Sequence, residues 1–256
     1  MPRFTWIAVV VGFSIVALVP TSWAGVVMSE TSVARSPAGA TTLNRTIYGQ
    51  GNKKKVEKPE VDSITDLDKG VVYIVDKRHK KYLEMPIPHS QPDEMGRRDS
   101  HGGAILLDKT PDTRVIANQT CTEYRGAHTN EIERIAVSAC VTRSAPGTSE
   151  LMAFDEKFSR KVGIEGQLPQ TETGESAGVA LEKRSMVRVL VPDVTRGHAY
   201  RVASFASKTE VREITLRQLP DATFAPPGSF SRITTAPALP APRQVPRAHD
   251  RDEYRV

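Results

Sequence analysis

The sequence predicts a mainly β, α+β fold built on an antiparallel sheet, and three observations lead to it. Residues 61–85 hold three short runs rich in Val, Ile and Tyr, separated by Gly or charge clusters, at 63–67, 71–75 and 81–85. The run at 71–75 is apolar throughout, so both of its faces must be covered. Residues 148–162 have the spacing of an amphipathic helix, which can supply one cover.

The first 24 residues have the pattern of a secretory signal peptide. A basic start at Arg3 precedes an apolar run at 6–19, and Ser22 and Ala24 put small residues where signal peptidase cleaves, so we expect cleavage after Ala24. This run of about 14 residues would span roughly 21 Å as a helix, short of the ~30 Å hydrocarbon core, so an uncleaved anchor is the weaker alternative. We expect a periplasmic or secreted protein that is soluble after cleavage, with at most peripheral membrane contact.

Short strands are expected through the first third of the mature chain. Residues 26–34, 41–49 and 53–57 precede the three runs, and the tight connections between them favour antiparallel neighbours. Residues 86–109 are rich in Pro and Gly and predict an irregular excursion or a short helix, with Met95 and residues 104–107 as the main apolar anchors.

Residues 113–141 predict a hairpin that contains the two cysteines of the chain. A reversal near Asn130 would place Cys121 and Cys140 directly opposite each other. In an oxidising compartment these residues would form a disulfide, worth roughly 3 kcal/mol for a closed loop of about 19 residues. Two buried free thiols are the alternative.

The helix predicted at 148–162 repeats Leu151, Phe154, Phe158 and Val162 at spacings of three and four. Thr148 or Ser149 can cap its start, and Gly163 can end it. A second set of strands follows at 179–181, 186–191, 198–207 and 210–217. Phe224, between two proline-bearing turns, is expected to plug the end of the sheet.

One domain is expected over residues 25–234. The remaining residues, 235–256, are rich in Pro and charge and have almost nothing to bury, which predicts a disordered tail.

Composition and motifs favour a binding or structural role over catalysis. The formal charge is only +5 and aromatics are 6% of the chain, which argues against a nucleic-acid partner. No nucleophile elbow, zinc motif or phosphate loop is present. Asp99, Ser100 and His101 are too close in sequence to form a triad, and His89 with His101 makes only a weak metal candidate. We therefore expect no enzyme activity, no metal and no cofactor.

Three segments together resemble an exported bacterial family of unknown function that is similar to the periplasmic lipoprotein carriers of LolA/LolB-like fold. They are SITDLDKGVVYIVDKRHKKYLEMPI, VIANQTCTEYRG and LPDATFAPPGSFSRI. This chain departs from the family pattern in having Phe230 where Tyr is usual, Gln119 and Thr120 before the first cysteine, and Cys140 in the return strand. The resemblance implies a strongly curved antiparallel sheet, an incomplete barrel, with helices covering its concave face.

In the carriers that this chain resembles, the concave side shelters acyl chains. By that resemblance we expect a non-catalytic binding protein that holds a hydrophobic ligand, an acyl chain or a lipidated peptide, between sheet and helix. The apolar residues expected to line the site are Val72, Ile74, Leu83, Met85, Met152, Phe154, Phe158 and Met186. The alternative is a cell-envelope structural or protein-interaction domain with a solid core, because the same residues would fill one.

Overall fold

A computed structural model describes residues 24–87, 105–163, 178–193 and 200–234 of this chain. The predicted signal peptide, most of the Pro- and Gly-rich excursion with His89 and His101, and the Pro-rich tail lie outside the described residues.

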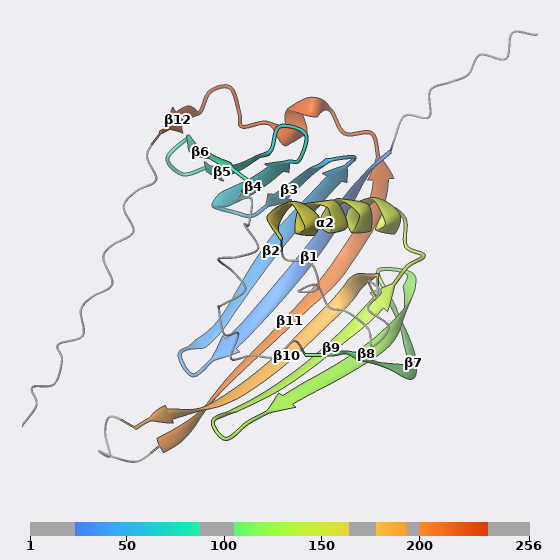
Figure 1. The fold of residues 1–256 in the computed structure, drawn as a ribbon, viewed down its shortest axis with the longest axis vertical. Helices are drawn as coiled ribbons and strands as arrows, with labels where there is room; N and C mark the ends of the chain where they lie inside the picture. The colour runs from blue at the N-terminus through green and yellow to red at the C-terminus, as the bar shows by residue number, and fades with distance from the viewer. Residues whose placement is uncertain (1–23, 88–104, 164–177, 194–199, 235–256) are drawn as a thin grey trace, which may run out of the picture.

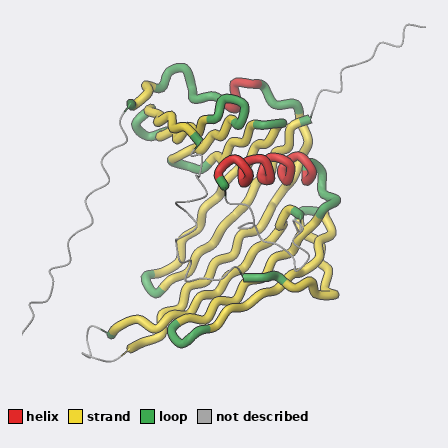
Figure 2. The backbone as a smooth tube through the Cα atoms, viewed as in Figure 1, coloured by secondary structure: helices red, strands yellow, loops and turns green. Residues whose placement is uncertain are grey.

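The described residues form a curved 12-stranded sheet in the order β12-β6-β5-β4-β3-β2-β1-β11-β10-β9-β8-β7, an open, incomplete barrel with a helix on its inner face (Figure 1). The first six strands are β1 (Gly25–Ser36), β2 (Gly39–Gln50), β3 (Lys53–Glu57), β4 (Val61–Asp66), β5 (Val71–Asp76) and β6 (Lys81–Pro86). The others are β7 (Asp108–Ile116), β8 (Gln119–Thr129), β9 (Glu133–Thr142), β10 (Val179–Pro192), β11 (Tyr200–Arg217) and β12 (Ser231–Ile233). The predicted fold class is confirmed, as Figure 2 shows by its predominance of strand.

The first six strands follow their predicted positions, because each is bounded by a turn that the sequence marks. Gly51 and Gly70 occupy such turns with φ of 58° and 68°, where a side chain would be strained. All neighbouring strands are antiparallel except β12, which pairs parallel with β6.

The second half differs from prediction in three places. The expected hairpin is a three-stranded unit, because Ala117 and Asn118 both take positive φ and form a tight turn between β7 and β8. The paired runs at 179–181 and 186–191 are one strand, β10, with a bulge near Leu181. The runs at 198–207 and 210–217 are likewise one strand, β11, whose irregularity lies opposite Ser29 and Glu30.

The predicted helix is confirmed as α2 (Thr148–Val162). Gly163 ends it at φ 67°, as expected. The helix begins at the predicted residue, but the predicted cap was wrong: Gly147 at φ 74° is the N-cap and no side chain caps it. The Thr148 hydroxyl donates instead to the Ala145 carbonyl at 2.7 Å.

Two covers bury the two faces of β5, as the apolar run predicted. On the inner face, Val72 packs against α2. On the outer face, Tyr73 and Val75 pack with Phe224 and Leu219 of the C-terminal segment, which includes the short 3-10 helix η1 (Asp221–Phe224). Phe224 is thus buried as the expected plug.

Candidate functional site

The eight residues predicted to line a ligand site divide into three groups. Val72 and Ile74 of β5 lie opposite Met85 and Leu83 of β6, respectively. Directly paired residues of antiparallel strands point to the same face. These four residues therefore share the inner face of the sheet, the face on which α2 lies.

Phe154 and Phe158 of α2 meet part of this group. Their rings stack with centroids 6.3 Å apart and planes at 9°. Phe154 is 3% exposed and packs with Leu67 and Ile87, and Val72 and Phe158 pack against the same cluster. The space between these phenylalanines and the sheet is therefore filled by the protein's own side chains.

Met152 and Met186 lie apart from that cluster. Met152 is half-buried on α2. Met186 is 45% exposed and pairs with Ala136 and Ala206. Its row of the sheet points to the outer face, away from α2, so the structure does not bring Met186 together with the other predicted residues.

The inner face continues beyond α2, and alternation along β1 shows which residues face it. Val26 and Met28 pack in one cluster with Leu151 of α2, so Ala34, an even number of residues away, faces the same side. Ala34 pairs with Ser207, which places Phe205 and Ala203 on the inner face as well.

The pairing of β11 with β10 and of β10 with β9 shows which residues of these strands lie on the same inner face. Several of them are apolar, and α2 does not cover them. Phe205 of β11 lies opposite Val187 of β10, which lies opposite Ile135 of β9. Six apolar residues of these strands on this face are named the inner apolar strip: Ile135, Val137, Val187, Val189, Ala203 and Phe205. At its two sides Val189 lies opposite Glu133, and Val137 lies opposite Ser185 and packs against the cluster that contains Leu107. Phe205 is 41% exposed, and both valines of β10 are half-buried.

The strip was missed at the sequence level, although a signal for it exists. Val187, Val189 and Val191 alternate with other residues, which is the pattern of a strand with one apolar face. The strand predicted at 186–191 was not assigned an apolar face and a polar face. The face itself could not be assigned without the pairing to β11.

Polar pairs separate the strip from the core beneath α2. The guanidinium of Arg45 donates to the carboxylate of Glu30, which is buried on the inner face. Ser32 and Thr209 share a hydrogen bond of 2.8 Å, and so do Ser185 and Ser207. The inner face thus has two apolar regions, one covered by α2 and one beyond it, with a polar boundary between them.

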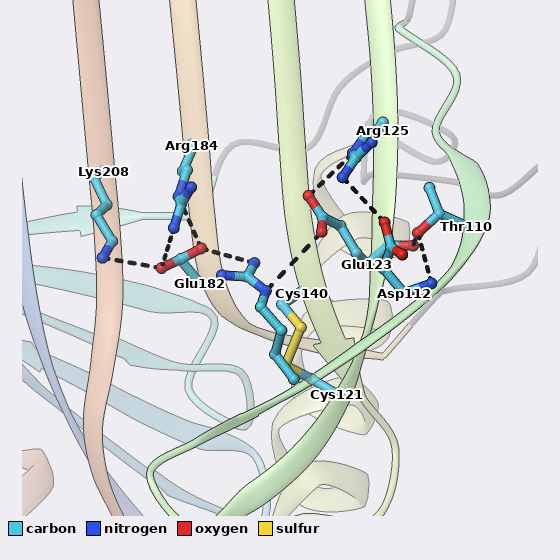
Figure 3. A network of polar contacts seen from close by, with 10 residues as sticks. Thr110, Asp112, Cys121, Glu123, Arg125, Cys140, Glu182, Arg184 and Lys208 are labelled. Atoms are coloured by element: carbon cyan, nitrogen blue, oxygen red, sulfur yellow. Dashed lines mark hydrogen bonds and ion pairs between the residues drawn. A yellow bond between two sulfur atoms is a disulfide. The ribbon is translucent and has the colours of Figure 1, made fainter.

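A charged network lies on the outer face beside the disulfide (Figure 3). The carboxylate of Glu182 is 3% exposed and contacts Arg114 at 2.8 Å, Arg184 at 2.9 Å and Lys208 at 3.0 Å. Burial alone would raise the pKa of Glu182, but the interactions with the three cations outweigh burial and hold it below its ordinary value.

The same network continues to β8, where Glu123 contacts Arg125 at 3.1 Å. The hydrogen bond from Arg125 holds the pKa of Glu123 below its ordinary value. These groups tie β7, β8, β10 and β11 together around the Cys121–Cys140 disulfide, whose Cα atoms are 5.3 Å apart. We call this network of ion pairs the clasp; it consists of Arg114, Glu123, Arg125, Glu182, Arg184 and Lys208.

The disulfide was predicted correctly, but its register was not. Cys140 lies opposite Glu123, so the bond runs diagonally between β8 and β9. The reason is the turn: the Asn130 side chain accepts hydrogen bonds from the backbone of Ile132 and Glu133, which moves the centre of the reversal toward β9.

Within the described ranges, the acidic, histidine and cysteine side chains form no group of three that could hold a metal ion. In those ranges, no helix combines the length and the hydropathy needed to cross a bilayer.

Comparisons with known proteins were made for the sequence and for the fold. No family model and no curated protein matches the chain. Among solved structures, it is similar to PNGF-II, with 8% sequence identity and a TM-score of 0.35, over 79% of this chain and 30% of that one. The chain therefore spans about a third of the PNGF-II chain.

Two further solved structures are similar over most of their own length. One is a LolA superfamily protein from Nitrosomonas europaea, with 8% identity and a TM-score of 0.28, over 80% of this chain and 91% of that one. The other is a DUF1329 family protein from Desulfovibrio piger, with 6% identity and a TM-score of 0.28, over 80% and 91%. The functional argument therefore rests on this chain's own side chains.

Proposed function

We propose that this chain is an exported, non-catalytic binding protein that holds an acyl chain, or the acyl part of a lipidated peptide, along the inner apolar strip. The observation that carries the proposal is the row formed by Ile135, Val187 and Phe205, which is apolar across three strands and lies outside the cover of α2. Exposed apolar surface of this kind on a curved sheet is suited to a partner with no hydrogen-bonding needs.

The proposed ligand differs from the predicted one in its place. The cluster of Phe154 with Leu67 and Ile87 fills the space between helix and sheet, so an acyl chain there would have to displace buried side chains. On the strip, a chain would add cover to exposed Phe205 and to half-buried Ile135, Val187 and Val189, whereas Ala203 is already buried. Each methylene that leaves water contributes about 0.8 kcal/mol, so the ~8 kcal/mol of micromolar binding corresponds to about ten fully covered methylenes, before the cost of association.

Export is part of the proposal and has two supports. Residues 1–24 carry the pattern of a cleaved signal peptide. The disulfide between Cys121 and Cys140 is typical of proteins that fold in oxidising compartments such as the periplasm.

The second candidate function is a structural or protein-interaction domain of the cell envelope. It is favoured by the filled core under α2, which needs no ligand to complete it. The two candidates differ in what the inner apolar strip does, so the strip is the place to test them.

The test compares two matched substitutions on β11. Phe205→Ser changes the strip, whereas Val202→Ser changes a residue on the outer face that is more exposed, at 61% against 41%. Binding is measured with a fluorescent fatty acid and purified mature protein. We expect Phe205→Ser to weaken binding about tenfold, since losing the ring contact costs about 1.4 kcal/mol or more. Val202→Ser should leave the dissociation constant within about twofold.

Native mass spectrometry of protein purified without detergent gives an independent readout. Copurified lipid that is lost in Phe205→Ser supports the proposal. Fatty acid binding that is absent, or equally affected by both substitutions, would overturn it and favour the structural domain. Thermal unfolding of both variants checks that each remains folded.

A further inference from the structure

A cleft of about 430 Å³ lies on the outer face, where the segment after β11 crosses the sheet. Tyr48 of β2, Lys55 of β3 and Arg217 at the end of β11 line it, together with Leu219 and Pro220 just before η1. The volume lies within the range of small-molecule sites.

Two cations and no carboxylate line this cleft. The ammonium of Lys55 forms ion pairs with Asp62, at 3.3 Å, and with Glu57, at 3.8 Å. These two carboxylates compensate much of its positive charge. Arg217 differs: in the described part of the chain no carboxylate lies within ion-pair distance of its guanidinium. Arg217 is exposed, and its Cζ lies 6.0 Å from the centroid of the Tyr48 ring.

The surrounding ion pairs fix the cleft's shape. The Tyr48 hydroxyl donates to Glu57 at 2.8 Å, and Lys77 bonds both Glu57, at 3.2 Å, and Asp62, at 2.8 Å. Burial, followed by the bond to Glu57, raises the pKa of Tyr48, so the phenol stays neutral at physiological pH. Lys55 lies over the same ring, 5.6 Å from its centroid. The ring is thus a neutral surface beside two cations.

We infer that this cleft binds a small organic anion, with a phosphate or carboxylate group on Arg217 and Lys55. A guanidinium fork matches the oxygens of either group in a bidentate geometry. The Gln218 amide and the Thr223 hydroxyl, which also line the cleft, add neutral donors. Leu219 and Pro220 offer a short apolar surface for the ligand's carbon atoms.

This site is separate from the inner apolar strip. It lies on the opposite face of the sheet, and the one strand that both sites share, β11, contributes Arg217 at its end to the cleft and Phe205 near its start to the strip. It therefore does not rest on the proposed acyl-chain function. The anion could be the headgroup of a lipid or a free metabolite, and the chemistry at Arg217 is the same for both.

The test follows backbone amides of Leu219 and Thr223 by NMR while inorganic phosphate is added to the mature protein. Arg217→Gln removes the charge at the cleft. Arg212→Gln is the matched control, because Arg212 is an exposed residue of the same strand whose guanidinium bonds Glu210 instead. We expect saturable shifts in the wild-type protein, at least tenfold weaker affinity in Arg217→Gln, and a change below about twofold in Arg212→Gln.

A second arm distinguishes the two sources of anion, using sedimentation with vesicles of phosphatidylglycerol and phosphatidylcholine. Pelleting that is lost in Arg217→Gln but kept in Arg212→Gln assigns the site to a lipid headgroup. Amide shifts without pelleting assign it to a soluble anion. If neither probe produces a response, or if Arg217→Gln responds as the wild-type protein does, the inference is overturned. Unchanged thermal unfolding shows that Arg217→Gln is folded.

Discussion

Glu182 shows how a single buried charge organises one half of this molecule. Its carboxylate is almost inaccessible to water, yet it receives contacts from three cations that belong to β7, β10 and β11. The cations themselves are partly exposed, with side chains 32% to 52% accessible. Water therefore screens their attraction for Glu182 on one side. The ion pairs contribute less to the free energy of unfolding than fully buried pairs would.

Glu182→Gln should lower the free energy of unfolding by about 2 kcal/mol. The substitution keeps the shape but removes the charge, which leaves Arg114 beside a neutral amide. Urea denaturation at pH 7 measures the effect. Glu156→Gln is the control, since Glu156 pairs with Arg160 on the exposed face of α2 and should cost less than about 0.5 kcal/mol.

The same residue predicts part of the acid sensitivity. The folded pKa of Glu182 lies below its unfolded value, so its contribution is complete above the ordinary carboxyl pKa of about 4.3 and is lost as the pH falls through the folded value. We expect the stability difference between the wild-type protein and Glu182→Gln to shrink as the pH is lowered from about 5. A difference that stayed constant down to pH 2 would contradict this assignment.

At the scale of elements, the disulfide and the clasp act on the same strands. Cys121 and Cys140 are 2% and 0% exposed. The bond joins β8 to β9, whereas Glu182 and Arg114 join β10 to β7. Together they hold the far edge of the sheet, on which α2 has few contacts.

Replacing both cysteines by Ala should lower the free energy of unfolding by about 3 kcal/mol, because the closed loop no longer restricts the unfolded chain. Denaturation of the double variant measures this loss. The native wild-type protein should resist a mild reductant, since reaction requires access to the sulfur atoms. Rapid labelling of both cysteines in the folded, reductant-treated protein would contradict that expectation.

Strand and helix boundaries could be predicted from the sequence where turn residues or helical spacing mark them. They were predicted less well where the pairing of distant strands determines them. Turn residues such as Gly70 and the three-and-four spacing of α2 gave nearly the observed boundaries of β1 to β6 and of the helix. The tight turn at Ala117 carries no Gly signal, so β7 was not separated from β8. Of the predicted site, Val72 and the two phenylalanines meet in space, but the strip centred on Val187 depends on register with β11, which no local pattern encodes.

At the scale of the whole molecule, the order of strands places β1 in the middle of the sheet. It pairs with β2 on one side and with β11, near the end of the domain, on the other, as Figure 1 shows by the blue and orange strands lying together. The β1–β11 ladder joins Gly25 to Arg217 and Arg35 to Ala206. Among the described strands, this ladder is the backbone hydrogen-bonded link between the two halves of the sheet, and α2 packs across both halves through β1, β2 and β10.

A chain that ends at Pro192, and so lacks β11, should not fold cooperatively. Without β11, both β1 and β10 lose a partner along most of their length, and the apolar side of β1 loses Val211. Circular dichroism with urea denaturation measures cooperativity. A sharp unfolding transition with a native-like slope would show that the first ten strands suffice, against this expectation.

The central position of β1 also sets when folding can occur during synthesis. Nearly two hundred residues must leave the ribosome before its second partner exists, and contacts so distant in sequence form slowly. Until then the nascent polypeptide presents an unsatisfied backbone edge, to which holding chaperones can attach. For the proposed route out of the cytoplasm, this delay is useful, because a translocation channel accepts chains that have not yet folded.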